Sequence, residues 1–353
     1  MKLPDFPWDA LAPYGDKAKA HPSGLIDLSQ GTPVDPTPDF IQEALQKASN
    51  SPSYPVTAGT LELREEISNW ASNNLGASGE FEVLPLIGSK ELVAWLPTIL
   101  ESEHVLYPEI AYPTYLVGSM IAKTRATKVD FDSIIWPDAD LAWVNSPSNP
   151  TGRVHTDKEL INAIQWARGG NGNRVVVADE CYLEFGNGIT PKSILSLTGG
   201  NNKNILAIHS LSKRSSMAGY RAAMMIGDKE LIAKILEVRK HAGMMVPLPV
   251  QRAMVAALAD KVHVEIQRDI YNARKAKVRS AIEKHGFKVD HSEAGLYLWA
   301  TRNERDWDSV DWFANQGILV TPGHFYGELG ANHVRIAMTA TDAQIDELVR
   351  RIG

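Results

Sequence analysis

Short apolar runs alternate with amphipathic segments through the first two thirds of the chain. The apolar runs are rich in β-branched side chains, which is typical of strands. We expect strands over residues 83–87, 104–107, 141–144, 174–178 and 204–209. Helices are expected over residues 61–75, 90–100, 112–124 and 160–168, the last after a capping box of Thr156 and Glu159. Because the strands are apolar throughout, both of their faces are buried, and the alternation predicts a mostly parallel sheet flanked by helices.

The pattern changes after Pro249. Residues 250–285 are almost continuously helical in pattern. They are followed by a helix near 307–316, by the apolar runs ILVTP (318–322) and HVRIAM (333–338), and by a last helix that starts at Thr341. We therefore expect an α/β fold with a large, mostly parallel α/β domain over residues 36–246 and a smaller α+β domain formed by residues 1–35 and 247–353.

Composition narrows the class of protein. The 353 residues are 44% hydrophobic, carry a net charge of −6 and contain no block of Lys and Arg, so nucleic acid is not an expected partner. The N-terminus lacks the apolar core of a signal peptide, and no apolar run approaches the ~20 residues of a membrane span. The single cysteine, Cys181, excludes an intrachain disulfide and fits a reducing compartment. We expect a cytoplasmic protein without membrane contact.

Four polar segments each follow an expected strand, at the sheet edge where open α/β sheets bind ligands. In the first, Ile87–Leu92 (IGSKEL), a helix begins directly after Gly88. A helix start presents free N–H groups, and the hydroxyl of Ser89 with the backbone N–H groups of Ser89 and Lys90 would suit a phosphate. An ordinary serine-capped helix has the same pattern.

Two further segments carry polar side chains at strand ends. The loop NSPSNPTG (145–152) contains Asn149, a candidate donor to a ring oxygen and to a substrate carboxylate, although the same loop reads equally well as a rigid connection. In VVVADECY (175–182), Asp179 follows four apolar residues, and a buried carboxylate needs a cationic or donor partner. A protonated pyridine nitrogen would serve, and Tyr182 would reach the ring hydroxyl of the same molecule. The alternative is an aspartate that caps the next turn.

The fourth segment, HSLSKRSSMAGYR (209–221), places Lys213 just past a buried strand. Desolvation and the neighbouring cations Arg214 and Arg221 would lower the pKa of its amine, which favours a Schiff-base nucleophile and proton shuttle. Arg221 would hold a phosphate together with Ser210 and Ser212. For any single lysine a solvated surface position is more common, but here four motifs occur together.

These four segments resemble the motifs of class I/II aminotransferases of the pyridoxal-phosphate (PLP) fold type I. SLSKRSSMAGYR resembles the family's S-x-S-K-x(6–8)-R segment, and the other three occur in the family's order over essentially the whole chain. The resemblance implies PLP as cofactor, bound as a Schiff base on Lys213, with amino acids and keto acids as substrates. Where the family usually has Thr or another polar residue after the lysine, this chain has Arg214, which we expect to make the pocket or its rim more basic.

Further site residues follow from the resemblance alone. Tyr112 matches the aromatic that stacks on the cofactor ring, and Gly31 matches the glycine beside the substrate. Arg335 matches the arginine that binds the substrate α-carboxylate. Tyr54 matches a tyrosine that reaches the partner subunit's phosphate, which implies a homodimer. A finer resemblance, in stretches such as LSQGTPVDPTP and EVRKHAGMMVP, is to actinobacterial N-succinyldiaminopimelate aminotransferases.

Other functions remain open. The same motifs occur in aspartate- and aromatic-type aminotransferases and in PLP enzymes that catalyse elimination or decarboxylation, such as C–S β-lyases. A non-catalytic, aminotransferase-like sensor is a third alternative, but such modules usually follow a DNA-binding domain, and the roughly 35 residues before the first helix of the large domain do not read as a helix-turn-helix. No H-E-x-x-H or similar spacing occurs, so no metal is expected. We expect Cys181 to be a buried side chain that contributes to packing and not a nucleophile.

One segment is a candidate for substrate specificity. Arg239–Pro247 (RKHAGMMVP) ends an expected helix and enters a turn. Arg239, Lys240 or His241 would meet a distal carboxylate, and Met244 and Met245 would pack on methylenes. The alternative is that the three basic residues only complement the dipole of the helix C-terminus.

Overall fold

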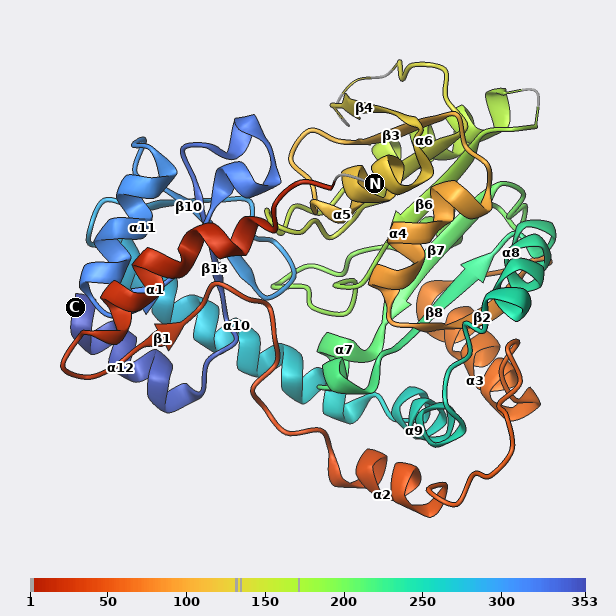
Figure 1. The fold of residues 1–353 in the computed structure, drawn as a ribbon, viewed down its shortest axis with the longest axis horizontal. Coiled ribbons are helices and arrows are strands. Elements are labelled where there is room, and N and C mark those ends of the chain that lie inside the picture. Colours follow the sequence, from red (N-terminus) through yellow and green to blue (C-terminus); the bar gives the residue numbers. More distant parts are fainter. Residues whose placement is uncertain (1–2, 131–132, 134, 171) are drawn as a thin grey trace.

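A computed structural model describes residues 3–130, 133, 135–170 and 172–353. Its larger part contains a seven-stranded sheet in the order β2-β8-β7-β6-β5-β3-β4 (Figure 1). The strands are β2 (Glu82–Ile87), β3 (His104–Pro108), β4 (Arg125–Val129), β5 (Leu141–Asn145), β6 (Val175–Asp179), β7 (Ile205–Ser210) and β8 (Ala222–Gly227). In this sheet β8 runs antiparallel to the other six strands. The expected mostly parallel α/β sheet is confirmed, and β4 and β8 are strands that the sequence pattern did not predict.

Helices cover both faces of this sheet, so its strands separate two apolar cores. Val176 and Ala178 belong to the core under α3 (Leu61–Trp70), α6 (Asp157–Gly169) and α9 (Leu248–Ala259). Val175 and Val177, which alternate with them, belong to the core under α4 (Ser89–Ile99), α5 (Thr114–Ala122) and α8 (Lys229–Ala242). Side chains of a strand point alternately to opposite faces, which explains why these strands are apolar at every position.

The smaller part is built on a four-stranded antiparallel sheet in the order β12-β13-β10-β9. Its strands are β9 (Lys288–Asp290), β10 (Tyr297–Thr301), β12 (Thr321–Pro322) and β13 (Val334–Ala337), and a parallel pair joins β1 (Ile26–Asp27) to β11 (Ile318–Leu319). The helices packed here are α1 (Ala12–Lys19), α10 (Val262–Glu283), α11 (Asp306–Asn315) and α12 (Asp342–Ile352). The run 318–322, expected as one strand, is divided between two sheets at Val320.

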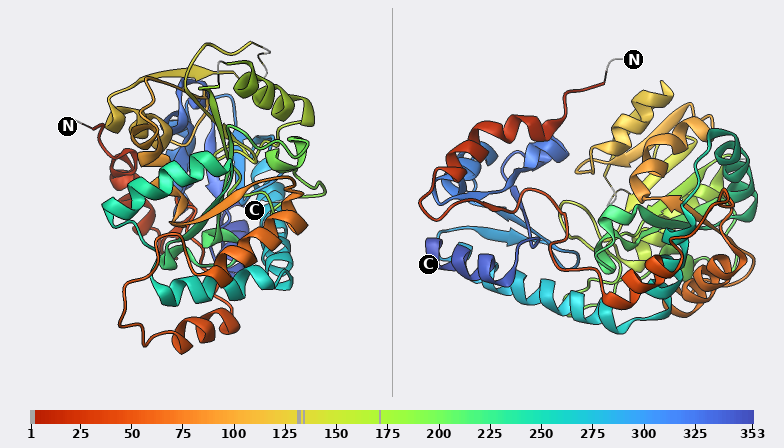
Figure 2. Two further views of the ribbon diagram at one scale, coloured as in Figure 1. Left: turned by 90° about the vertical axis from the view of Figure 1, so that its right-hand side faces the viewer. Right: turned by 60° about the horizontal axis from the view of Figure 1, so that its bottom comes forward.

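The remaining elements are short. They are η1 (Pro7–Leu11), α2 (Asp39–Lys47), the π-helical turn η2 (Ala71–Leu75), η3 (Ile194–Leu197), α7 (Leu211–Arg214), η4 (Ala218–Tyr220), η5 (Gly323–Tyr326) and η6 (Glu328–Gly330). In the right-hand view of Figure 2, the N-terminal segment leaves the smaller part and extends toward the larger one. Among the described residues, no helix is both long and apolar enough to cross a bilayer.

The expected helix over 250–285 is interrupted at Asp260 and Lys261, which separate α9 from α10. Val250, Met254 and their neighbours on α9 pack in a core of the large domain, although they follow the expected boundary at 246. Tyr271 and Val278 of α10 pack in the core of the small domain. We therefore propose a boundary near Asp260, because core membership divides the two helices there.

Candidate active site

The carboxyl ends of three neighbouring strands open into one cavity of about 790 Å³. Asn145 ends β5, Asp179 ends β6 and Ser210 ends β7, so the parallel register brings their side chains to one edge. The small domain closes the other side. Of the cofactor and substrate residues that the four motifs and the family resemblance suggested, all but Tyr54 line the cavity, namely Gly31, Ser89, Lys90, Tyr112, Asn149, Asp179, Tyr182, Ser210, Ser212, Lys213, Arg221 and Arg335.

Lys213 lies on the single turn α7, directly after β7. Ser210 caps this turn, because its hydroxyl accepts the N–H of Ser212 at 3.1 Å. The Lys213 amine donates to the carbonyl of Gly31. Burial, and then the positive charges of Arg335 and Arg221, lower the pKa of Lys213 to about 8. A substantial fraction of this amine is therefore neutral and nucleophilic near neutral pH.

Arg214, next to Lys213, points away from the cavity. Its side chain is 3% exposed and forms two hydrogen bonds to the Glu184 carboxylate, at 2.5 and 3.2 Å. A third bond goes to the carbonyl of Ala257 at 3.1 Å. The expectation that Arg214 makes the pocket more basic is wrong, because Glu184 neutralises its charge outside the cavity. Arg335 is the cation that acts on Lys213 in its place.

Asp179 presents a buried carboxylate to the cavity. Tyr115 donates its hydroxyl to Oδ2 at 2.9 Å, and the N–H of Cys181 donates to Oδ1 at 3.3 Å. Burial raises the pKa of Asp179, and these two donors oppose that shift. Among the residues that the structure describes, no Lys, Arg or His forms a salt bridge with it. A desolvated carboxylate that lines a cavity without a paired cation fits a protonated ring nitrogen.

Arg335 approaches the cavity from β13 of the small domain. It is 3% exposed, and its Nη atoms donate to Asn149 Oδ1 at 2.9 Å and to the carbonyl of Ser29 at 2.7 Å. Asn149 is held in turn by Asn145, whose Oδ1 accepts the Asn149 N–H at 2.8 Å. No carboxylate pairs with Arg335 among the described residues, so its guanidinium can bind an anionic ligand.

Tyr297, which the sequence pattern did not indicate, also lines the cavity. Its hydroxyl is 2.9 Å from the hydroxyl of Tyr182, and the Arg335 guanidinium lies 4.3 Å from the centre of its ring. A Cβ at Gly31 would overlap with the Tyr297 hydroxyl. Gly31 is thus required by close packing on an aromatic side chain. A single tyrosine at a strand start carries no sequence signal of its own.

A corner of the cavity suits a phosphate. Helix α4 begins at Ser89 after Gly88, which has φ +71°, and no side chain caps the first N–H groups of this helix. A Cβ at Gly88 would overlap with the Arg221 guanidinium, so glycine lets the arginine approach the helix start. Free N–H groups at a helix N-terminus beside an arginine form an anion site. Burial raises the pKa of the adjacent Cys181 thiol, which fits the expected packing role.

Two expectations concern residues outside this cavity. Tyr54 is 92% exposed between α2 and α3, so its role at a partner's phosphate stays a prediction. Arg239 is fully buried, with Nη1 2.6 Å from both Glu91 oxygens and Nη2 3.1 Å from the Met244 carbonyl. The expectation that Arg239 binds substrate is therefore wrong, because its guanidinium group joins the end of α8 to α4. The contacts of the described residues do not test Lys240, His241, Met244 or Met245, so their role in substrate binding stays a prediction.

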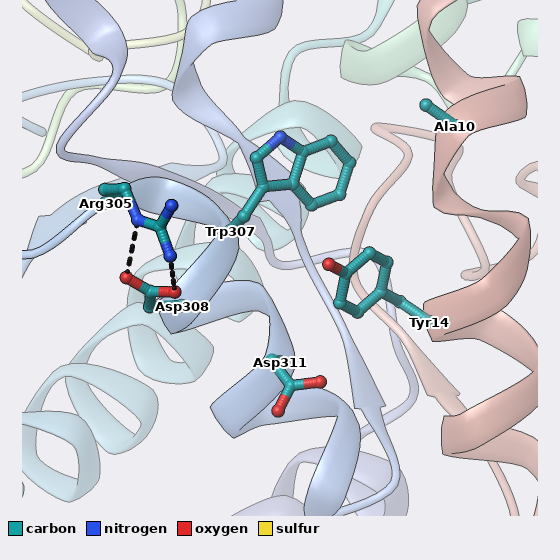
Figure 3. A pocket seen from close by; sticks show the side chains of 6 residues that line it. All are labelled: Ala10, Tyr14, Arg305, Trp307, Asp308 and Asp311. Atoms are coloured by element: carbon teal, nitrogen blue, oxygen red, sulfur yellow. Dashed lines mark hydrogen bonds and ion pairs between the residues drawn. The ribbon is translucent and has the colours of Figure 1, made fainter.

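A second, more open pocket of about 530 Å³ lies between α1 and α11 (Figure 3). It contains none of the candidate residues. Arg305 is paired with Asp308 at 2.8 Å, and Tyr14 stacks on Trp307 with ring centres 5.0 Å apart, so the polar and aromatic groups that line it already have partners. The described residues contain no cluster of His, Cys, Asp or Glu that could hold a metal ion.

Comparison with known proteins agrees with this geometry. Residues 23–352 match the family model described as aminotransferase class I and II. The chain is 52% identical over 99% of its length to a probable aminotransferase of Mycobacterium tuberculosis, of which it covers 85%. It is 49% identical to the 4-dedimethylamino-4-oxo-anhydrotetracycline transaminase OxyQ of Streptomyces rimosus, with 99% of each chain covered.

The fold comparison points the same way. A solved structure of a probable N-succinyldiaminopimelate aminotransferase from Thermus thermophilus superposes with a TM-score of 0.88 at 27% identity, over 98% of this chain and 99% of that one. The family match covers both domains and all the cavity residues from Gln30 onward. The chain therefore belongs to the class I and II aminotransferases and is a pyridoxal-phosphate-dependent transaminase.

Proposed function

We propose that the enzyme exchanges an amino group between N-succinyl-LL-2,6-diaminopimelate and 2-oxoglutarate or glutamate. The observation that carries the proposal is the cavity in which Lys213, Asp179 and Arg335 converge from two domains. The motifs resemble those of N-succinyldiaminopimelate aminotransferases, and the Thermus thermophilus protein described by that name shares the fold. The transaminase activity belongs to the family, whereas the succinylated substrate is our proposal.

The cavity residues have distinct roles in this proposal. Pyridoxal phosphate, when bound, supplies an electron sink that stabilises negative charge on the substrate α-carbon. Asp179 would hold the ring-nitrogen proton, Tyr182 and Asn149 would bind the ring oxygen, and Tyr112 would cover the ring face. Ser89, Lys90, Ser210, Ser212 and Arg221 form the phosphate corner.

Lys213 and Arg335 would act on the substrate itself. Arg335 binds the α-carboxylate, which fixes the α-carbon in the cavity. Lys213 holds the cofactor covalently between turnovers. The free amine of Lys213, whose pKa burial lowers to about 8, would take the proton from the substrate α-carbon. The first substrate would leave as a keto acid while its amino group stays with the enzyme, and a second keto acid would accept that group in the other half-reaction.

The outer part of the cavity supports an elongated substrate. Phe6, Val93, Val117 and Ile121 give it an apolar wall that would pack on a chain of methylenes. The amine of Lys90 lies 5.9 Å from the centre of the Phe6 ring, at the edge of this wall. An apolar wall beside a cation suits a side chain with a distal carboxylate, as a succinylated diamino acid has.

The same wall favours a second candidate substrate. OxyQ is described as a transaminase of an oxo-anhydrotetracycline and is 49% identical over nearly the whole of both chains. A polycyclic ketone would also pack against Phe6, Trp8 and Val117. This candidate differs from the first in that it needs no distal carboxylate at Lys90.

A substrate panel separates these functions. The enzyme loaded with the amino group from glutamate is mixed with the keto forms of the candidate substrates, and the aminated products are measured. Our proposal predicts that the kcat/KM for the succinylated keto acid exceeds that for the polycyclic ketone by at least about tenfold. If the enzyme prefers the polycyclic ketone, the succinylated keto acid is not its substrate. Release of pyruvate and ammonia from cysteine conjugates would indicate a β-lyase.

We also propose a homodimer in which each site is completed by its partner. Tyr54 is almost fully exposed, and Val56 and Leu61 beside it are 60% and 63% exposed. An apolar group of this kind indicates a surface that another chain covers. Sedimentation should show a dimer at working concentration, and Tyr54→Ala should weaken phosphate-dependent cofactor binding. A fully active monomer would contradict this arrangement.

A further inference from the structure

Lys275 is a buried lysine with an unusual environment. It lies on α10, is 2% exposed, and donates from Nζ to the carbonyl of Gly295 at 2.9 Å. Among the described residues no carboxylate pairs with it. The neighbouring Arg274, by contrast, has salt bridges to Asp35 and Asp342. A buried ammonium group with a carbonyl as its partner is costly, so a lysine at this position calls for a reason beyond packing.

The acceptor of this bond belongs to a turn that joins the two domains. The turn consists of residues 292–295, between β9 and β10 of the small domain. The N–H groups of Ser292 and Ala294 donate to the carbonyls of Thr151 and Gly152, each at 3.0 Å. These two acceptors belong to the 145–152 loop that carries Asn149. The turn therefore fixes one large-domain loop of the active site.

The same turn fixes a second loop of the active site. The N–H of Gly295 donates to the carbonyl of Phe185 at 2.9 Å, and Ala294 forms a β-bridge with Gly186. Gly295 has φ +78°, and a Cβ there would lie only 3.8 Å from the Cβ of Tyr182. Two residues later, Tyr297 contacts the Tyr182 hydroxyl at 2.9 Å. The turn thus lies directly behind the two tyrosines of the cavity wall.

Helix α10 is well placed to carry this constraint. It contacts β9, β10 and α12 in the small domain, and it also contacts α7, the turn that carries Lys213. Figure 1 shows α10 running along both parts of the molecule. A bond from α10 to the 292–295 turn therefore connects one rigid element to both sides of the cavity.

We propose that Lys275 is a positioning residue of the active site: its amine holds the Gly295 carbonyl, and so fixes the 292–295 turn against the loops that carry Asn149 and Tyr182. This role goes beyond the proposed substrate, because it applies to any amino acid whose carboxylate Arg335 binds. Burial lowers the pKa of Lys275 to about 8, which agrees with an amine that has few polar partners. No covalent step involves Lys275.

The test compares Lys275→Met with Lys277→Met. Methionine has about the same length but cannot donate, whereas Lys277 lies on the same helix, is half exposed and pairs with Asp346. With glutamate as donor, Lys275→Met should lower kcat/KM by about 10- to 100-fold, because small displacements of positioned groups have effects of this size. Most of the loss should appear in KM, since Asn149 and Tyr297 both contact Arg335. Lys277→Met should leave both constants within about twofold.

A second measurement does not depend on turnover. In the protein without cofactor, hydrogen exchange should accelerate at the amides of Ser292, Ala294 and Gly295 in Lys275→Met, while the β6 and β7 amides keep their protection. Lys275→Arg, which retains a charged donor, should restore part of the protection and of the KM. If Lys275→Met does not fold, Lys275→Gln, a donor one atom shorter, should show the same local exchange in weaker form.

Two results would overturn the proposed role of Lys275. Unchanged KM together with unchanged exchange at the three amides would overturn it. Faster exchange spread over the whole molecule, with KM unaffected, would also overturn it, because Lys275 would then only stabilise the fold. A failure of the succinylated substrate in the panel leaves this test intact, since glutamate is the donor measured here.

Discussion

Tyr115 donates its hydroxyl to the carboxylate of Asp179 at 2.9 Å, and its ring stacks on Trp143 with centres 5.0 Å apart. The bond crosses from α5 to the end of β6, so a helix that covers the sheet also sets the charge of the residue at its edge. Burial raises the pKa of Asp179, and the Tyr115 hydroxyl opposes this by stabilising the charged form.

Tyr115→Phe therefore should raise the pKa of Asp179 further. The acid limb of the pH profile of kcat/KM should move to higher pH, and the rate at neutral pH should fall by about tenfold, the size expected for one hydrogen bond to a charged group. The stack on Trp143 is retained, so folding is little affected. Tyr107→Phe is the control, because Tyr107 is also a buried tyrosine of this core and has no contact with Asp179. If the two variants have the same pH profile of kcat/KM, the Tyr115 hydroxyl has no effect on the ionisation of Asp179.

Replacement of Asp179 tests the ring-nitrogen contact. Asp179→Ala should still bind the cofactor, because Ser89, Ser210 and Arg221 remain at the phosphate corner. Single-turnover measurements should nevertheless show removal of the α-proton slowed by several orders of magnitude, since the protonated ring nitrogen loses its anionic partner. If the variant reacts at a near-normal rate, the carboxylate only caps the turn that begins at Cys181.

Gly31 and Tyr297 form a pair whose coupling can be measured. Gly31→Ala should raise the KM for all amino acids by about tenfold or more, because the new Cβ displaces the Tyr297 hydroxyl beside Arg335. In the double variant Gly31→Ala, Tyr297→Phe the clash is reduced, so the second substitution should recover part of the loss caused by the first. Strictly additive effects in this double-mutant cycle would show that the two residues do not interact.

Much of the fold and of the site was predictable from residue patterns. The predicted strands of the large sheet are mostly apolar, and the four polar segments that follow them contain eleven of the cavity residues. The strand β8 escaped prediction because AAMMIG lacks β-branched residues at most positions and is specified by pairing with β2 and β7. This pairing depends on residues that are distant in the sequence, so a local pattern does not predict it.

Side-chain direction was the other gap. Arg214 follows Lys213 directly, yet on the short turn α7 it points to Glu184, a partner 30 residues earlier. Arg239 likewise finds Glu91, 148 residues away. Tyr115 and Tyr297 were missed for the same reason: each is an aromatic in an apolar segment, and only the tertiary fold brings its hydroxyl to a polar partner. Long-range partners of this kind have no local sequence signature.

The pKa of Lys213 predicts how the unloaded enzyme takes up its cofactor. The neutral amine is the reactive form, and at pH 7 roughly a tenth of an amine with a pKa of about 8 is neutral, against roughly one in 2,500 for an ordinary lysine. The rate of covalent attachment of pyridoxal phosphate should rise with pH, with a midpoint near pH 8 and a plateau above about pH 9. Arg335→Met should move the midpoint upward, because the Arg335 charge contributes to the lowered pKa. A midpoint near pH 10 in the unmodified enzyme would refute a perturbed Lys213.

The assignment on which the other roles depend is Lys213 as the residue that carries the cofactor. It is tested most directly by reducing the enzyme with borohydride in the presence of pyridoxal phosphate and mapping the labelled peptide. We expect a single labelled peptide that contains Ser212-Lys213-Arg214, and Lys213→Ala should lose both the label and essentially all turnover with glutamate. Label on another lysine, such as Lys90 or Lys275, with activity retained in Lys213→Ala, would contradict it.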